Sequence, residues 1–172
     1  MSGFKIGDKI IYPNQGVGVI EDIQVEDCYG QEYVVYHVRI LANNTLVLVP
    51  STSIEDMGIR KPISEEAIEE IFELLKNGQV VINNNWKGRY KEHAEMMQSG
   101  EIKNVALVLK NLYQLNQVKP LSFREKKMME KAKQLLVTEL SEVGHLPPEE
   151  VEKKLMENLV AGTENQPPHL DS

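Results

Sequence analysis

The sequence predicts an α+β fold, in which a small N-terminal antiparallel β-barrel precedes an all-α helical bundle. Two patterns lead to this prediction. From residue 4 to residue 50, short segments rich in β-branched and aromatic residues follow one another with no helical segment between them. From residue 64 onward, apolar residues instead recur every three or four positions, which is the period of an amphipathic helix.

Short strands account for most of the first 50 residues. The expected strands are residues 9–12, 16–20, 32–40 and 45–49, with a hairpin loop at Asp27–Gly30 and a turn at Asn43–Asn44. The strand Thr45–Val49 lacks the polar alternation of a strand with one solvent face. It is either an edge strand that offers its backbone to another protein or a central strand buried on both faces.

Five helices are expected in the rest of the chain, over residues 64–77, 85–99, 102–116, 122–143 and 147–161. Ser64 is the expected N-cap of the first helix, and Gly78 its stop. Ser122 and Glu125 form a capping box at the start of the fourth helix. The apolar stripes are too narrow for any helix to be stable alone, so we expect the helices to pack as one bundle.

These elements predict four parts of the chain. Residues 1–62 form the β domain, residues 63–82 a connecting helix and linker, residues 83–161 the helical domain, and residues 162–172 a disordered tail.

The charges are strongly segregated along the chain. The net charge is −7, yet residues 83–136 hold 11 Lys and Arg against 5 Asp and Glu, a local net charge of +6. Such a block is a candidate surface for binding phosphate. The alternative is a chance excess of Lys on solvated helices. The acidic total argues against a general nucleic-acid coat, which would be basic throughout.

The composition excludes several classes of protein. One Cys rules out an intramolecular disulfide framework and fits a reducing compartment. The four His residues are far apart and none has metal-ligand spacing with another ligand, so we expect no metal, no cofactor and no enzyme. No apolar run approaches the roughly 18 residues of a membrane span, and the N-terminus has no signal-peptide pattern. We therefore expect a cytoplasmic, monomeric protein with no membrane partner.

The segment Asn83–Lys91 carries the most informative motif. It holds the only Trp, Trp86, at the start of a helix among Lys87, Arg89 and Lys91. Cations that hold phosphates beside a flat apolar ring suit contact with a DNA duplex. However, Trp86 also lies on one helical stripe with His93 and Met97, so a buried core role is the alternative.

A second basic cluster lies in the helix that begins at Ser122. It includes Lys126 and Lys127, on either side of the apolar stripe. Such lysines are usually solvated borders of a core stripe. A phosphate-binding role requires that this helix edge line up with the Trp86 helix.

Eight short motifs follow one another along the chain: Phe4–Pro13, Gly16–Gly18, Val49–Pro50, Met57–Arg60, Asn85–Lys91, Ser99–Gly100, Val105–Ala106 and Leu121–Met128. Over about residues 4–160, they resemble the CarD/CdnL family of bacterial transcription regulators. Each motif is weak alone, but their order and spacing together are specific.

The resemblance implies an N-terminal Tudor-like barrel that binds the β subunit of RNA polymerase by strand addition, through Leu46, Val47 and Leu48. It also implies a helical domain that contacts promoter DNA at the upstream edge of the melted bubble, where Trp86 is a minor-groove wedge that stabilises the open complex. Lys87, Arg89 and Lys91 would contact the DNA backbone, as would Lys126 and Lys127.

The chain departs from the family pattern in two places. Many members have two consecutive Arg residues where this chain has Gly88–Arg89, so one phosphate contact is in doubt. Glu26 and Leu48 stand at polymerase-facing positions where some members have basic residues. The second departure leaves the polymerase contacts less charged. The first, at Gly88, keeps a second interpretation open, that of a polymerase-bound protein adaptor whose helical domain does not contact DNA.

Overall fold

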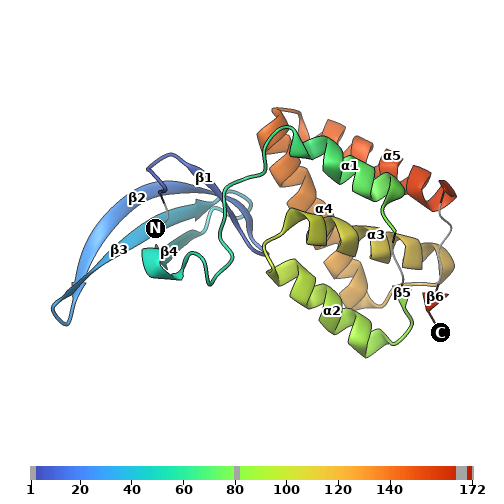
Figure 1. Ribbon diagram of the computed structural model, residues 1–172, viewed down its shortest axis with the longest axis horizontal. Coiled ribbons are helices and arrows are strands. Elements are labelled where there is room, and N and C mark those ends of the chain that lie inside the picture. Colours follow the sequence, from blue (N-terminus) through green and yellow to red (C-terminus); the bar gives the residue numbers. More distant parts are fainter. Residues whose placement is uncertain (1–2, 80–81, 166–169, 172) are drawn as a thin grey trace. The chain divides into compact units, whose positions relative to one another are not determined.

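The computed structural model describes residues 3–79, 82–165 and 170–171, and the chain divides into two compact units (Figure 1). The first unit is Met1–Pro62 and the second is Ile63–Ser172. The first contains the β-strands of the predicted N-terminal domain, and the second contains the five α-helices found among the described residues. The α+β class predicted from the sequence is confirmed.

The first unit is a four-stranded antiparallel sheet in the order β1-β2-β3-β4. Its strands are β1 (Lys9–Tyr12), β2 (Gly16–Cys28), β3 (Gln31–Ile40) and β4 (Leu46–Pro50), and a short 3-10 helix, η1, follows at Ser51–Ser53. The sheet is not closed, because β1 and β4 form its two edges. The expectation of a closed barrel is therefore wrong. Among the described residues, β1 pairs beyond β2 only through an isolated bridge between Ile11 and Arg60.

The strand β2 is longer than the expected 16–20, because it pairs with β3 as far as Cys28 opposite Gln31. The two-residue turn between them is Tyr29–Gly30, and both residues have positive φ angles, as a type I′ hairpin turn requires. The register shifts between Ile20 and Asp22, which marks a bulge in β2. At Gly18 a side chain has no room, since an added Cβ would lie 2.6 Å from Val38 Cγ1.

The core of the first unit lies on one face of this sheet. Its buried residues are Phe4, Ile10, Ile20, Tyr36, Val38, Ile40, Val49, Ile54 and Ile59. The rings of Phe4 and Tyr36 meet edge to face, with centroids 6.2 Å apart.

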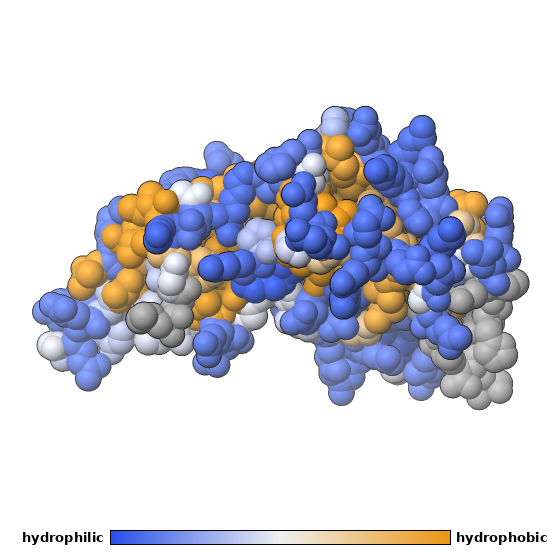
Figure 2. Space-filling model, turned by 45° about the horizontal axis from the view of Figure 1, so that its top comes forward, coloured by the Kyte–Doolittle hydropathy of each residue, from blue (hydrophilic) through white to orange (hydrophobic). Residues whose placement is uncertain are grey.

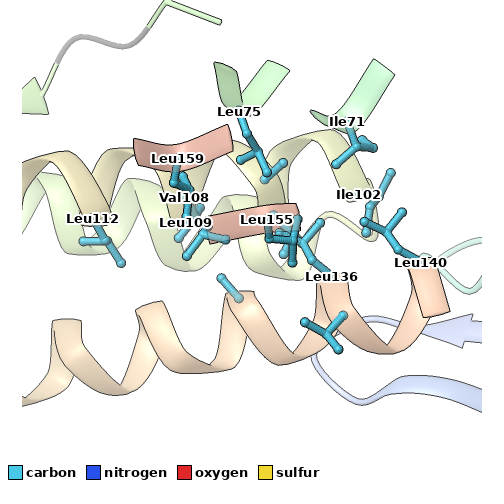
Figure 3. Close-up of a cluster of buried hydrophobic side chains, with 14 of the residues drawn as sticks. Ile71, Leu75, Ile102, Val108, Leu109, Leu112, Leu136, Leu140, Leu155 and Leu159 are labelled. Atoms are coloured by element: carbon cyan, nitrogen blue, oxygen red, sulfur yellow. The ribbon is translucent and has the colours of Figure 1, made fainter. Parts of the chain in front are cut away.

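In the described part of the second unit, five helices pack around one core. Figure 3 shows part of this core, with labelled side chains from the first, third, fourth and fifth helices. The helices are α1 (Ala67–Asn77), α2 (Trp86–Gln98), α3 (Ile102–Val118), α4 (Phe123–Gly144) and α5 (Pro148–Asn165). The helix α3 contacts each of the other four. The core side chains come from all five helices, and Leu75, Leu109, Leu136 and Leu155 are among the most buried.

Two expectations about the first helix are wrong. Ser64 is not its N-cap, because α1 begins only at Ala67, after Glu66, without a side-chain cap. Nor is α1 a connector: it packs against α3 and α5, and buries Ile71 and Leu75 in the shared core. The helix ends as predicted, with the Gly78 amide donating to the Leu74 carbonyl.

The disordered tail was expected to begin at residue 162, which is too early. The chain is still helical there, because it packs against the C-terminal end of α1. The helix α5 continues to Asn165, and Gly162 is buried in it against α1, where an added Cβ would lie 2.5 Å from the Leu75 carbonyl oxygen. The Lys110 ammonium, also buried, donates to the Gly78 carbonyl at 2.6 Å and fixes this end of α1. Further on, β6 (Leu170–Asp171) pairs in parallel with β5 (Ile82–Asn83). Residues 166–169 and 172 of the expected tail lie outside the described residues.

Candidate nucleic-acid interface

Trp86 is the first residue of α2, and its side chain is 37% exposed. Its ring stacks on Tyr90, one turn along the helix, with centroids 5.9 Å apart and an angle of 19° between the planes. Its Nε1 donates to Ser122 Oγ at 3.2 Å. Of the predicted stripe, His93 and Met97 are buried, whereas Trp86 is a partly exposed ring held in a fixed orientation.

Arg89 is not available to DNA, which contradicts the expectation from the sequence. Its side chain is 4% exposed and forms a bidentate ion pair with Glu125 of α4, with Nε–Oε2 at 2.7 Å and Nη2–Oε1 at 3.0 Å. Its Nη1 donates to the Asn83 carbonyl at 2.8 Å. The guanidinium therefore ties α2 to both α4 and β5, and its role is to hold these elements together.

The start of α4 is fixed by the predicted cap. Ser122 Oγ accepts from the Glu125 amide at 3.2 Å, which confirms Ser122 as the N-cap. Burial raises the pKa of Glu125, but the hydrogen bonds and charge of Arg89 outweigh burial and leave this pKa below its usual value. The buried Glu125 carboxylate thus pairs with Arg89. In a full capping box, it would instead accept a hydrogen bond from the backbone amide of Ser122.

His93 lies beneath this ion pair. The Asn111 amide donates to its Nε2 at 3.1 Å. Burial lowers the pKa of His93 to about 4, and the nearby charges of Glu125 and Arg89 act on it in opposite directions. The imidazole is therefore neutral at pH 7 and packs as a core residue.

The start of α2 thus lies beside the start of α4, and the chain carries exposed cations on both helices. Lys87 and Lys91 are exposed on α2, and Lys126 and Lys127 on α4. The Arg124 guanidinium lies over the Tyr90 ring, 4.2 Å from its centroid. We call Trp86, Tyr90, Phe123 and Arg124, with these four lysines, the aromatic–basic surface.

Three members of this surface, Tyr90, Phe123 and Arg124, were not among the site residues expected from the sequence. Phe123 is 72% exposed, and Tyr90 supports both Trp86 and Arg124. Phe123 could have been found, because it lies off the apolar stripe of its own helix. The role of Tyr90 depends on its contact with Arg124, 34 residues away, and no local pattern indicates it.

The second candidate site is the strand β4. Of the two alternatives for Thr45–Val49, an edge strand or a central strand buried on both faces, the structure shows the edge strand. Among the described strands it pairs only with β3, and its side chains alternate: Leu46 is 41% exposed and Leu48 is 53% exposed, whereas Val49 is buried and Val47 half-buried. Figure 2 shows apolar residues at the surface of this unit among hydrophilic ones. Glu26 is exposed on β2 opposite Tyr33, and β3 lies between it and β4.

The described part of the chain offers few other kinds of site. None of its helices has the length and apolarity needed to cross a membrane. Within the same residues, no three His, Cys, Asp or Glu side chains are grouped so as to hold a metal ion.

Both units match known protein families. Residues 4–63 match the CarD-like/TRCF RID domain, and residues 70–156 match the CarD C-terminal domain. "Putative transcription factor YdeB" of Bacillus subtilis (strain 168) is 32% identical over 137 residues, covering 80% of this chain and 90% of that protein. The chain belongs to the CarD/CdnL family. It is therefore a transcription-associated factor of a family whose N-terminal domain type interacts with RNA polymerase.

Two solved N-terminal domains are also similar in sequence. The 72-residue N-terminal domain of Myxococcus xanthus CarD, a solution NMR structure, is 33% identical, covering 34% of this chain and 77% of that domain with a TM-score of 0.30. CdnLNt from the same organism is 38% identical, covering 37% of this chain and 90% of that one with a TM-score of 0.31.

Proposed function

We propose that this CarD/CdnL family member binds the β subunit of RNA polymerase through β4 and stabilises the promoter open complex through the aromatic–basic surface. The observation that carries the proposal is the state of Trp86. Its ring is partly exposed, oriented by Tyr90 and Ser122, and accompanied by exposed cations on two helices. A rigid apolar ring, with cations on its own helix and on the helix beside it, is suited to wedge into a minor groove.

The β4 edge supports the polymerase half of the proposal. An edge strand presents backbone donors and acceptors that a partner strand can pair with, and Leu46 and Leu48 add apolar contacts. The charge of the helical surface is modest because Arg89 is paired internally. DNA affinity alone is then weak, and attachment to polymerase raises the effective concentration of the helical unit at the promoter.

Variants of the DNA-contacting surface and of the polymerase-binding strand should change the open-complex lifetime in different ways. Trp86→Ala removes the wedge, so it lowers the maximal lifetime of the open complex at any protein concentration. Leu48→Ala weakens the anchor by up to about tenfold, so a higher protein concentration restores the full lifetime. Val160→Ala, an exposed apolar residue of α5, is the matched control and leaves both quantities unchanged.

The test measures open-complex lifetime after competitor challenge, with the cognate polymerase and a titration of each protein. Circular dichroism verifies that the variants are folded. A folded Trp86→Ala protein with full effect would contradict the wedge, and would favour the adaptor interpretation, in which the helical unit binds a protein.

A further inference from the structure

Phe123 is an unusually exposed aromatic residue at a rigid position. It is the first residue of α4, directly after the Ser122 cap, and 72% of its side chain is exposed. Leu121, two residues earlier, is buried and fixes the entry to the helix. Large aromatic rings normally bury most of their area, so a ring held outside the core on a capped helix is a candidate contact residue.

A cation already lies on one face of this ring. The Lys127 ammonium, one helical turn later, lies 4.9 Å from the Phe123 ring centroid. The lysine side chain remains exposed, so its ammonium can also reach a phosphate group. The pair thus presents an apolar surface and a positive charge within one turn of α4.

Phe123 lies next to the Trp86 site. Ser122 receives the Trp86 Nε1 hydrogen bond and is joined to Phe123 by a peptide bond. The following residue, Arg124, covers the ring of Tyr90, on which Trp86 stacks. The contacts that orient Trp86 therefore also fix the start of α4, the turn that carries the Phe123–Lys127 pair.

We propose that Phe123 is a second apolar DNA contact of this surface, with its ring against a deoxyribose or an unstacked base and Lys127 on the adjacent phosphate. The charges favour this occupant, because the Lys127 ammonium lies over the ring, and Arg124 and Lys126 are exposed on the same first turn of α4. The inference rests on the proposed function, and it adds a DNA contact on a helix other than that of Trp86.

Site-specific photo-cross-linking in open complexes tests the placement directly. The full chain carries p-benzoylphenylalanine at position 123, 86 or 160 in complexes with polymerase and end-labelled promoter DNA. We expect adducts with DNA from positions 123 and 86, and none from position 160 on α5. DNA adducts from position 86 but not from position 123 would overturn the inference and leave the proposed function standing. Without DNA adducts from either position, both fail.

Lifetime measurements separate the two members of the pair. Phe123→Ala shortens the open-complex lifetime by about fivefold or more, by the same factor at each salt concentration, because a stacking contact releases no counterions. Lys127→Gln instead reduces the dependence of the lifetime on salt. Phe123→Tyr keeps the ring and most of the effect. If the folded Phe123→Ala protein has the lifetime of the Val160→Ala control, Phe123 is not a DNA contact.

Discussion

The two candidate surfaces differ in how they are built. The β4 edge consists of neighbours in sequence, carries no charged residue, and owes its availability to the absence of a further strand beside it among the described residues. The aromatic–basic surface joins residues 36 positions apart, and a buried ion pair beneath it holds α2 to α4. The first surface therefore depends on local sequence, whereas the second depends on long-range contacts and on buried charge.

The largest effect is expected from breaking the ion pair. Arg89→Ala leaves the Glu125 carboxylate buried without its partner, which costs about 3–5 kcal/mol of unfolding free energy. Urea unfolding followed by the fluorescence of Trp86, the only Trp, measures this loss in the helical unit.

Two further variants make this result specific. Lys87→Ala, an exposed neighbour on α2, is the matched control and should change the stability by less than about 0.5 kcal/mol. Replacing both partners with apolar residues, as in Arg89→Met with Glu125→Leu, should recover part of the loss, because no unpaired charge remains. A loss as small as that of Lys87→Ala would mean that Arg89 is solvated and free to contact DNA.

Acid should distinguish the two units. In the unfolded chain His93 binds a proton below about pH 6.5, whereas in the folded chain burial keeps it neutral down to a pKa of about 4. The unfolded state therefore binds more protons between these values, and stability is lost as the pH falls through this window, by about 3 kcal/mol in total. The lowered pKa of Glu125 acts in the same direction at still lower pH.

Amide hydrogen exchange of the full chain at pH 7 and pH 4.5 measures this difference unit by unit. Protection in α2 and α4 should fall more than protection in β2 and β3, where the carboxylates with lowered pKa, Glu21 and Asp22, lie near the surface. His93→Gln should reduce the pH dependence of the helical unit. Equal losses in the two units, or a pH dependence that persists in His93→Gln, would show that His93 is not the cause.

Features that depend on local sequence could be predicted, whereas features that depend on long-range contacts could not. The segments of β1, β3 and β4, Gly78 as the stop of α1, and the Ser122 cap depend on a few neighbouring residues, and each was predicted. The burial and pairing of Arg89 were not predicted, because its partner Glu125 lies 36 residues away. A guanidinium beside an exposed Trp has the same local pattern whether it faces DNA or a buried carboxylate.

Packing between distant segments also explains the other errors. The helix α5 was expected to end at residue 161, but it continues to Asn165 because Gly162 packs closely against the Leu75 carbonyl. The period of α1 predicted a helix but not its place in the bundle, which depends on α3 and α5. Sheet closure likewise depends on whether the two edge strands meet, which no strand pattern specifies.

The smallest expected effect concerns Gly88, where many family members have Arg. An added Cβ there would lie 3.4 Å from Asn83 Nδ2, an ordinary contact, so the backbone does not require glycine at this position. Gly88→Arg should add one phosphate contact, raising the affinity of the full chain for duplex DNA a few-fold at low salt and steepening its log–log salt dependence by about 0.9. Fluorescence anisotropy at several salt concentrations measures both quantities.

Gly88→Ala, which stabilises α2 by up to about 1 kcal/mol without adding charge, is the control and should leave the slope of the salt dependence unchanged. Equal slopes for the two variants would place position 88 away from the phosphates, whereas a steeper slope for Arg with unaltered polymerase binding would show that the aromatic–basic surface is tuned independently of the β4 edge.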